Sequence, residues 1–160
     1  MTTAADQTAA VREVLLEIVI EAPRERVWRA LVDQTTDWWH KDFYTAPAEG
    51  FFLQPKLGGW MYEDWGNGNG LMWGTVTGVR APEMLQVVGD LNSDWGGPHR
   101  GIMDWTLTAV EGRPGTTTLR FRHGLFGKIS DKTRDSLDGG WRMLFETCLK
   151  PFAEDAKVDD

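Results

Sequence analysis

The sequence predicts one α+β domain in which a curved antiparallel sheet wraps around a long C-terminal helix. Alternating apolar residues, typical of half-buried strands, recur through most of the chain, and glycine clusters separate these segments. One long amphipathic pattern follows, from about Asp131 to Ala153. Because strands and helices do not alternate, a parallel sheet is disfavoured, and a sheet that embraces one helix buries both apolar faces.

The first elements are predicted to be a strand and two short helices. Residues 13–21 alternate between apolar and mostly acidic side chains, which is the period of a strand with one buried face. Pro23 stands where a first helical turn accepts proline, so a short helix is expected over residues 24–33. A second helical turn is expected over residues 35–40.

From Gly50 onward the chain has the turn residues of antiparallel hairpins. The run from Gly66 to Gly70 supplies the positive-φ residues of a tight turn between strands at 60–65 and 71–80. Both faces of 60–65 contain aromatic residues, so its inward face stays open. Three further strands are expected at 84–89, 101–110 and 117–123, which gives a sheet of about six to seven strands.

Two irregularities interrupt the pattern of the last helix. Gly139 and Gly140 each destabilise a helix by roughly 1 kcal/mol relative to alanine, so a kink or a close approach to the sheet is expected there. Pro151 is expected to bend or fray the last turn. The whole pattern predicts a single domain over residues 11–155, with flexible tails at 1–10 and 156–160.

The composition excludes several classes of protein. Seventeen basic and twenty-four acidic residues give a net charge of −7, without a basic cluster that could follow a nucleic-acid backbone. No apolar run has the length of a membrane span, and the N-terminus lacks the pattern of a secretory signal, so a cytoplasmic location is expected. The single cysteine, Cys148, cannot form an internal disulfide and is interpreted as a small buried hydrophobe rather than a reactive thiol.

The unusual feature of the composition is its tryptophan content. A tryptophan has a large ring and one N–H that needs a partner, so a domain of this size has difficulty in packing all of them in a solid core. We expect several to line a cavity, the alternative being a division between core and surface. The nine tryptophans are Trp28, Trp38, Trp39, Trp60, Trp65, Trp73, Trp95, Trp105 and Trp141.

Several short motifs resemble one known family. They are the segment at 22–31, the pair Trp38-Trp39, Gly58-Gly59 before an aromatic strand ending in Glu63, Gly74-Thr75-Val76 leading to Ala81-Pro82, and Gly140-Trp141. This pattern, from about Val11 to Phe152, resembles the activator-of-heat-shock-protein-90-ATPase-homologue-like group of the START and birch-pollen-allergen superfamily (SRPBCC). The resemblance implies a helix-grip fold with a deep, largely apolar cavity, which members of the superfamily use for lipids, polyketides, plant hormones and other aromatic molecules.

The resemblance supplies no universal catalytic residue. The eukaryotic activator pairs this domain with a separate N-terminal domain, so we expect a chaperone partner not to carry over. The pattern also resembles single-domain self-resistance proteins that sequester or quench reactive natural products. Both points favour a small molecule as the partner.

We predict that aromatic side chains form the walls of a ligand cavity and that two polar rings orient the ligand. The predicted ligand-binding residues are Trp60, Tyr62, Trp73, Trp105, Phe121, His123 and Trp141. His123 shares a strand face with Phe121 and can contact a ligand or act as acid or base, although the favoured alternative is a strand-end histidine satisfied by the backbone or water.

The other polar residues of interest are two carboxylates and two histidines. Glu63 is a second candidate base if it faces inward, whereas Asp104 falls on the outward face. His99 is expected to be a mobile surface ring in a glycine-rich loop, and His40 a surface residue at a helix end. Nothing has the spacing of a metal site or of a phosphate or dinucleotide motif, so no metal and no cofactor are expected.

Three functions follow from the sequence. The leading hypothesis is a protein that binds a small hydrophobic or aromatic molecule for transport, sequestration or self-resistance. The second is an enzyme that catalyses cyclisation, dehydration or hydrolysis of a polycyclic or polyketide-like molecule, with His123 or Glu63 as acid or base. The third is a protein-interaction module of the co-chaperone type, which requires an exposed apolar or charged patch.

Overall fold

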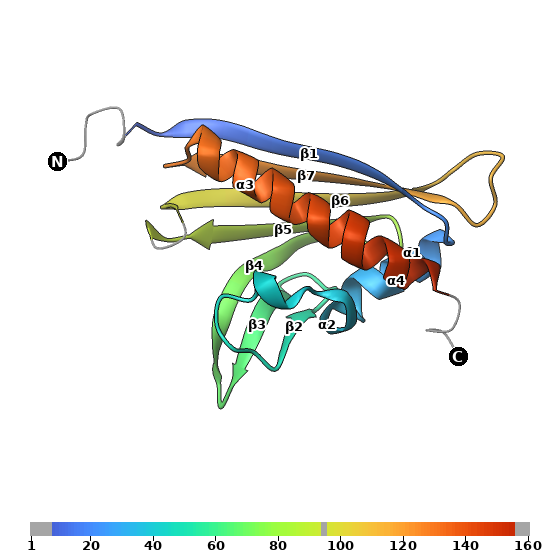
Figure 1. The fold of residues 1–160 in the computed structure, drawn as a ribbon, viewed down its shortest axis with the longest axis horizontal. Helices are drawn as coiled ribbons and strands as arrows, with labels where there is room; N and C mark the ends of the chain where they lie inside the picture. The colour runs from blue at the N-terminus through green and yellow to red at the C-terminus, as the bar shows by residue number, and fades with distance from the viewer. Residues whose placement is uncertain (1–7, 94–95, 156–160) are drawn as a thin grey trace.

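The computed structural model describes residues 8–93 and 96–155 of the 160-residue chain. Trp95 and most of the two predicted tails, residues 1–7 and 156–160, lie outside this description. Within the described residues, one antiparallel sheet has the strand order β1-β7-β6-β5-β4-β3-β2. A long C-terminal helical segment crosses one face of this sheet (Figure 1). The predicted α+β helix-grip fold is therefore confirmed.

The seven strands and the helical elements have the following bounds. The strands are β1 (Ala10–Ile20), β2 (Gly50–Leu53), β3 (Trp60–Gly66), β4 (Asn69–Arg80), β5 (Met84–Leu91), β6 (His99–Ala109) and β7 (Thr117–Gly127). Between β1 and β2 lie α1 (Arg24–Val32), α2 (Thr35–Trp38) and the 3₁₀ helix η2 (Lys41–Phe43). The C-terminal segment consists of α3 (Asp131–Arg142), the π-helical η4 (Met143–Leu149) and α4 (Lys150–Glu154).

Alternation along β1, β6 and β7 places one largely apolar face of these strands against the helix, as predicted, while the other face carries the charged residues and a few exposed apolar ones. The buried side chains include Val14, Leu16, Ile18 and Ile20 on β1, Met103, Trp105 and Leu107 on β6, and Leu119, Phe121 and His123 on β7. On the opposite face, Glu17 pairs with Arg120 across the β1–β7 ladder at 3.2 Å. The two faces of these strands are therefore chemically distinct.

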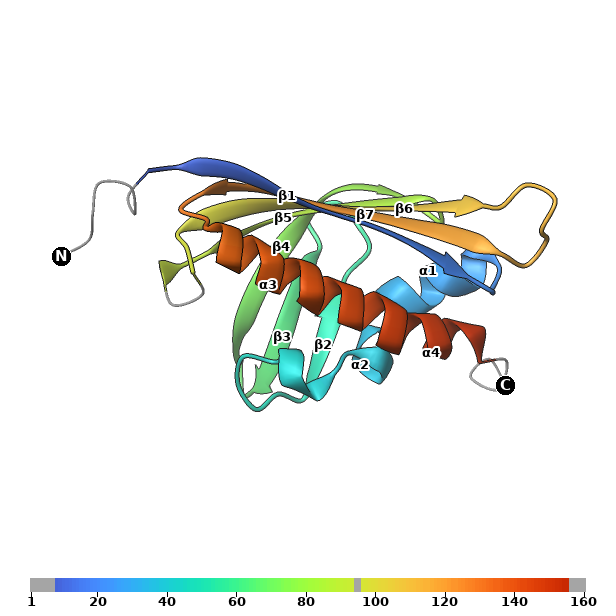
Figure 2. The same cartoon turned by 45° about the horizontal axis from the view of Figure 1, so that its top comes forward.

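The sheet bends at its β2–β4 end. Register shifts interrupt the β3–β4 ladder at Met61/Tyr62 and Asp64/Gly66, and the β4–β5 ladder at Val76/Gly78. Such bulges increase the local twist and curvature of a sheet. Figure 2 shows the result, in which β2 and β3 turn away from the plane of β1, β6 and β7 toward the side occupied by the helix.

A tight turn closes the β3–β4 hairpin, as the glycine run predicted. Asn67 and Gly68 both have positive φ, 56° and 79°. Two consecutive positive-φ residues are typical of the type I′ turn that matches the twist of a hairpin.

The C-terminal helical segment runs from Asp131 to Glu154, close to the predicted range. The predicted close approach at its glycines is to the 3₁₀ helix η2 rather than to the sheet, since a Cβ on Gly140 would lie 2.9 Å from Cε1 of Phe43. Pro151 does not fray the last turn. Instead the segment before it is π-helical, with the Lys150 N–H bonded to the Phe145 carbonyl five residues back.

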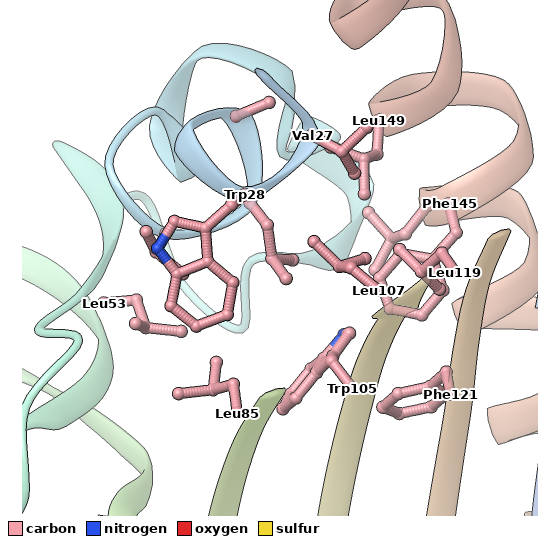
Figure 3. Packing of buried hydrophobic residues seen from close by; sticks show 14 of the residues in the cluster. Val27, Trp28, Leu53, Leu85, Trp105, Leu107, Leu119, Phe121, Phe145 and Leu149 are labelled. Carbon is pink, nitrogen blue, oxygen red and sulfur yellow. The ribbon is translucent and has the colours of Figure 1, made fainter. Parts of the chain in front are cut away.

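The hydrophobic core lies between the sheet, the C-terminal helix and α1. Figure 3 shows Val27 of α1 beside Leu149, and the Trp105 ring between Leu85 and Phe121. All five of these side chains are at most 2% exposed. Among the described residues, no helix is both long enough and apolar enough to cross a membrane.

Candidate functional site

Aromatic rings fill most of the space between the sheet and the helix. Trp39 stacks on Phe51 with their centroids 3.8 Å apart, and Trp141 stacks on Phe145 at 5.4 Å. The Trp105 ring lies 6.3 Å from the Trp141 ring, nearly perpendicular to it. In this region, where several tryptophans were expected to line a cavity, they instead form a packed aromatic cluster.

A small cavity remains at one end of this cluster. Its volume of about 20 Å³ is enough for about one water molecule. Strands β4, β5, β6 and β7 contribute most of its walls, and α3 covers it with one side chain. The lining residues are Trp73, Gly89, Leu91, His99, Gly101, Met103, His123 and Leu137.

His123 lies on the inward face of β7, at 5% exposure. The Trp141 indole N–H donates to its Nδ1 over 3.1 Å. A neutral imidazole with Nδ1 as acceptor carries its proton on Nε2. Burial, with a smaller effect from nearby His99, lowers the pKa of His123 to about 4. The ring is therefore neutral near pH 7, and Nε2–H is its remaining donor.

Gly101 gives the His123 ring its place on the sheet. A Cβ at residue 101 would lie 2.4 Å from Nε2 of His123, closer than any real contact. Residue 101 must therefore lack a side chain for the ring to lie across β6. Gly89, which also lines the cavity, is needed for a different reason, since a Cβ there would lie 1.8 Å from the Trp73 carbonyl oxygen.

His99 is the site residue that the sequence analysis placed wrongly. It is not a mobile surface ring but the first residue of β6, opposite Gly127, and it is 5% exposed. Burial lowers the pKa of His99, although Asp90 acts in the opposite direction. The burial of His99 could have been predicted from its spacing of two residues from Gly101 and four from Met103, because this spacing places all three on the inward face of β6.

Two of the polar rings at the cavity carry buried nitrogens without partners. Among the residues that the structure describes, neither ring nitrogen of His99 has a hydrogen-bond partner, and neither does the Trp73 indole nitrogen. An unpaired buried polar group costs about 1–3 kcal/mol, so such groups usually indicate a water or a ligand. The indole nitrogen of Trp105 is also unpaired, but Trp105 does not line this cavity.

The seven predicted ligand-binding residues separate into three groups. Trp73 and His123 line the small cavity. Trp105, Phe121 and Trp141 belong to the packed cluster beside it, with the Phe121 and Trp141 centroids 4.8 Å apart. Trp60 and Tyr62 form the third group.

Trp60 and Tyr62 lie on the outer face of β3, away from the cavity. Trp60 is 50% exposed, whereas Met61 and Glu63 between and after them are buried. The expectation that Trp60 and Tyr62 line the cavity is corrected by this register. Inward aromatic residues at this end of the sheet are Trp73 on β4 and Phe51 on β2, whose rings pack edge-on at 5.5 Å.

Glu63 faces inward and is fully buried, but its carboxylate is already occupied. It accepts hydrogen bonds from the Thr45 backbone N–H at 2.7 Å, from the Thr45 hydroxyl, and from the Trp65 indole at 3.0 Å. These bonds hold the loop that precedes β2 against β3. The geometry therefore gives this predicted acid–base candidate a structural role.

The remaining polar candidates lie away from the cavity. Asp104 is on the outer face, as predicted, and accepts a hydrogen bond from Gln86 at 2.8 Å. His40 is half-buried at the start of η2, where Nδ1 accepts from the Asp42 N–H. Cys148 is half-buried, and burial raises the pKa of its thiol. Within residues 8–93 and 96–155, no cluster of histidine, cysteine and acidic residues is arranged to hold a metal.

The strand order and the helix held in the curve of the sheet define a helix-grip fold. Gly101, His123 and Trp141 join the helix to the sheet at the end that retains a cavity. The chain belongs to the family described as Activator of Hsp90 ATPase homolog 1-like protein, whose model matches residues 21–153, and through this family to the START and birch-pollen-allergen superfamily.

Solved structures share the fold at low sequence identity. An uncharacterised protein from Rhizobium leguminosarum has a TM-score of 0.67 at 17% identity, covering 92% of this chain and 97% of its own. The protein Ara h 8.0201 has a TM-score of 0.65 at 8% identity, with coverages of 90% and 98%. A norcoclaurine synthase from Thalictrum has a TM-score of 0.58 at 9% identity, with coverages of 94% and 98%. A search of curated proteins gave no match.

Proposed function

We propose that this protein binds a small, largely aromatic molecule between the sheet and α3, at the end marked by Trp73, His99 and His123. The observation that carries the proposal is the convergence of three polar rings, two with unpaired buried nitrogens, on one cavity. Mostly apolar walls with a few polar groups are typical of small-molecule sites. Transport, sequestration or self-resistance, in the cytoplasm, are the roles such binding would serve.

A ligand needs more room than the present cavity, and the start of α3 is the element that can provide it. Trp141 is the buried residue of α3, so the ten residues before it hold no fully buried side chain. Leu137 covers the cavity from this stretch, and Gly139-Gly140 lie two and three residues further along it. Outward movement of residues 131–138 about these glycines would widen the site without disturbing Trp141.

The contacts that hold the start of α3 are weak. Asp131 pairs with Arg12 of β1 at 2.8 Å, and Arg134 donates to the Glu13 carbonyl at 2.9 Å. Asp131 is largely exposed, and exposed ion pairs contribute about 0–1 kcal/mol each. The outward movement of residues 131–138 therefore costs little free energy compared with the free energy gained by burying an aromatic ligand. The norcoclaurine synthase in complex with a transition state analogue supports the capacity of this fold for a small molecule.

The test measures, by calorimetry, the affinity of the protein for a panel of aromatic and polycyclic compounds. Leu137→Phe is the variant expected to block the site. The larger side chain fills the cavity mouth, so binding is expected to fall at least tenfold. Ser136→Phe, at an exposed position of the same helix, is the matched control and should bind normally. Equal affinities of both variants and wild type would reject this site. Mass spectrometry of each mixture separates binding from turnover, and a changed ligand would favour the enzyme hypothesis.

A second candidate function is supported by one exposed patch on the outer face of β2–β4. Phe52, Trp60 and Met72 are 39%, 50% and 43% exposed, and Tyr62 lies among them. Trp60, Tyr62 and Met72 border a hollow that Glu49 and Asp64 also line. The patch therefore suits a protein partner that presents basic and apolar side chains. The test is whether the protein stimulates the ATPase activity of purified Hsp90. Stimulation that is lost in Trp60→Ala and kept in Leu137→Phe would support this function.

A further inference from the structure

We infer, resting on the proposed function, that the ligand of this site presents a neutral carbonyl oxygen to the Trp73 and His123 N–H groups. Aryl ketones and quinones are the chemical class that this describes. The inference comes from the hydrogen-bonding capacity that the cavity leaves unused.

The cavity offers two obligatory donors. An indole nitrogen can only donate, so the buried Nε1–H of Trp73 requires an acceptor. His123 accepts the Trp141 N–H at Nδ1, which leaves Nε2–H as its free group. An oxygen with two lone pairs can accept from both rings, whereas a hydrocarbon leaves both donors unpaired.

His99 does not change this requirement. A neutral imidazole has one donor and one acceptor, so His99 can donate to the same oxygen or accept from a ligand hydroxyl. His99 therefore adapts to the ligand, while Trp73 and His123 set the demand for an acceptor.

The acceptor is expected to be neutral because, among the residues that the structure describes, no fixed positive charge lines the cavity. Its lining consists of tryptophan, glycine, leucine, methionine and two histidines. Arg100, beside His99 in sequence, is directed to the surface, where it pairs with Asp90 at 2.8 and 3.0 Å. Burial of a carboxylate without a cationic partner costs several kcal/mol. A carbonyl oxygen meets the donors without that cost.

Three ligands of one ring framework test the inference. Fluorenone has the carbonyl, fluorene has a methylene in its place, and fluorene-9-carboxylate has an anion. We expect fluorenone to bind wild-type protein about ten times more tightly than either of the others. Calorimetry or displacement of a fluorescent probe measures all three affinities.

A variant pair assigns the effect to the Trp73 N–H. Trp73→Phe keeps an aromatic ring and removes the donor, so it is expected to weaken fluorenone about tenfold and to leave fluorene nearly unchanged. Unchanged fluorene binding also shows that the site is intact. Trp60→Phe, on the outer face, is the control and should affect neither ligand.

The possible outcomes separate this inference from the function it rests on. Equal binding of fluorene and fluorenone, or tightest binding of the carboxylate, overturns the carbonyl preference and leaves ligand binding in place. If Trp73→Phe loses binding of both fluorene and fluorenone, Trp73 acts in the site through packing alone. This outcome also overturns the carbonyl preference. Failure of all three compounds, together with the whole aromatic panel, contradicts the proposed function itself.

Discussion

The indole N–H of Trp141, on the C-terminal helix, donates a hydrogen bond to Nδ1 of His123, on β7, over 3.1 Å. Both side chains are buried, at 2% and 5% exposure. The bond joins the helix to the sheet at the boundary between the packed aromatic cluster and the cavity. It also determines which nitrogen of His123 faces the ligand site as a donor.

Stability is expected to fall as the pH decreases from about 6.5 to 4.5. The pKa of His123 falls from 6.5 to about 4 on folding, because burial disfavours the charged ring, and the pKa of His99 is lowered in the same direction. The unfolded state therefore binds more protons in this window, and the stabilisation present above pH 6.5 is lost on acidification. The His123 shift corresponds to at most about 3 kcal/mol. Urea unfolding at several pH values measures it.

His123→Gln provides the control for this pH dependence. Glutamine does not titrate, and its amide oxygen can still accept the Trp141 N–H. The variant should have a flatter stability profile between pH 6.5 and 4.5 than wild type. The same slope in wild type and variant would show that His123 does not cause the effect.

Gly101→Ala is expected to destabilise the protein by about 1–3 kcal/mol. The new Cβ would lie 2.4 Å from Nε2 of His123, so either the ring or the strand must move. Gly124→Ala is the matched control, because the nearest atom to a Cβ there is the Ile102 carbonyl oxygen at 4.0 Å. Thermal unfolding of both variants checks this. Equal losses would indicate that the destabilisation of Gly101→Ala does not come from its contact with His123.

Glu63→Gln is expected to reduce stability by about 2–4 kcal/mol and to leave ligand affinity unchanged. The carboxylate accepts from three donors, whereas an amide offers one oxygen and turns its NH₂ toward a donor of Thr45 or Trp65. Chemical unfolding and ligand titration are measured on the same sample. Normal stability with lost binding or turnover would instead restore Glu63 as a functional residue.

Alternation predicted the inward faces of the sheet wherever one face was polar. In β1, β6 and β7 this pattern placed Trp105, Phe121 and His123 correctly. It failed in β3, because aromatic residues stand on both faces and only the bulges around Met61/Tyr62 and Asp64/Gly66 fix the register. Trp60 and Tyr62 were therefore assigned to the wrong side.

The hydrogen-bond partners of the site could not be predicted from the sequence. Thr45, which binds Glu63, lies in a loop without periodicity, 18 residues away along the chain. His99 follows a glycine-rich loop, and its burial depends on where β6 begins. The small volume of the cavity could not be predicted from the sequence either. The composition gives the number of tryptophans but not contacts such as the stacking of Trp39 on Phe51.

The most direct test of the ligand site is an NMR titration that follows the indole N–H signals of the tryptophans. With fluorenone and the aromatic panel as probes, the Trp73 indole signal is expected to shift saturably, because its unpaired N–H acquires an acceptor, while the Trp60 signal stays in place. Saturable binding that moves the Trp60 signal and leaves Trp73 unchanged would contradict the account and would place the ligand on the outer face of the sheet.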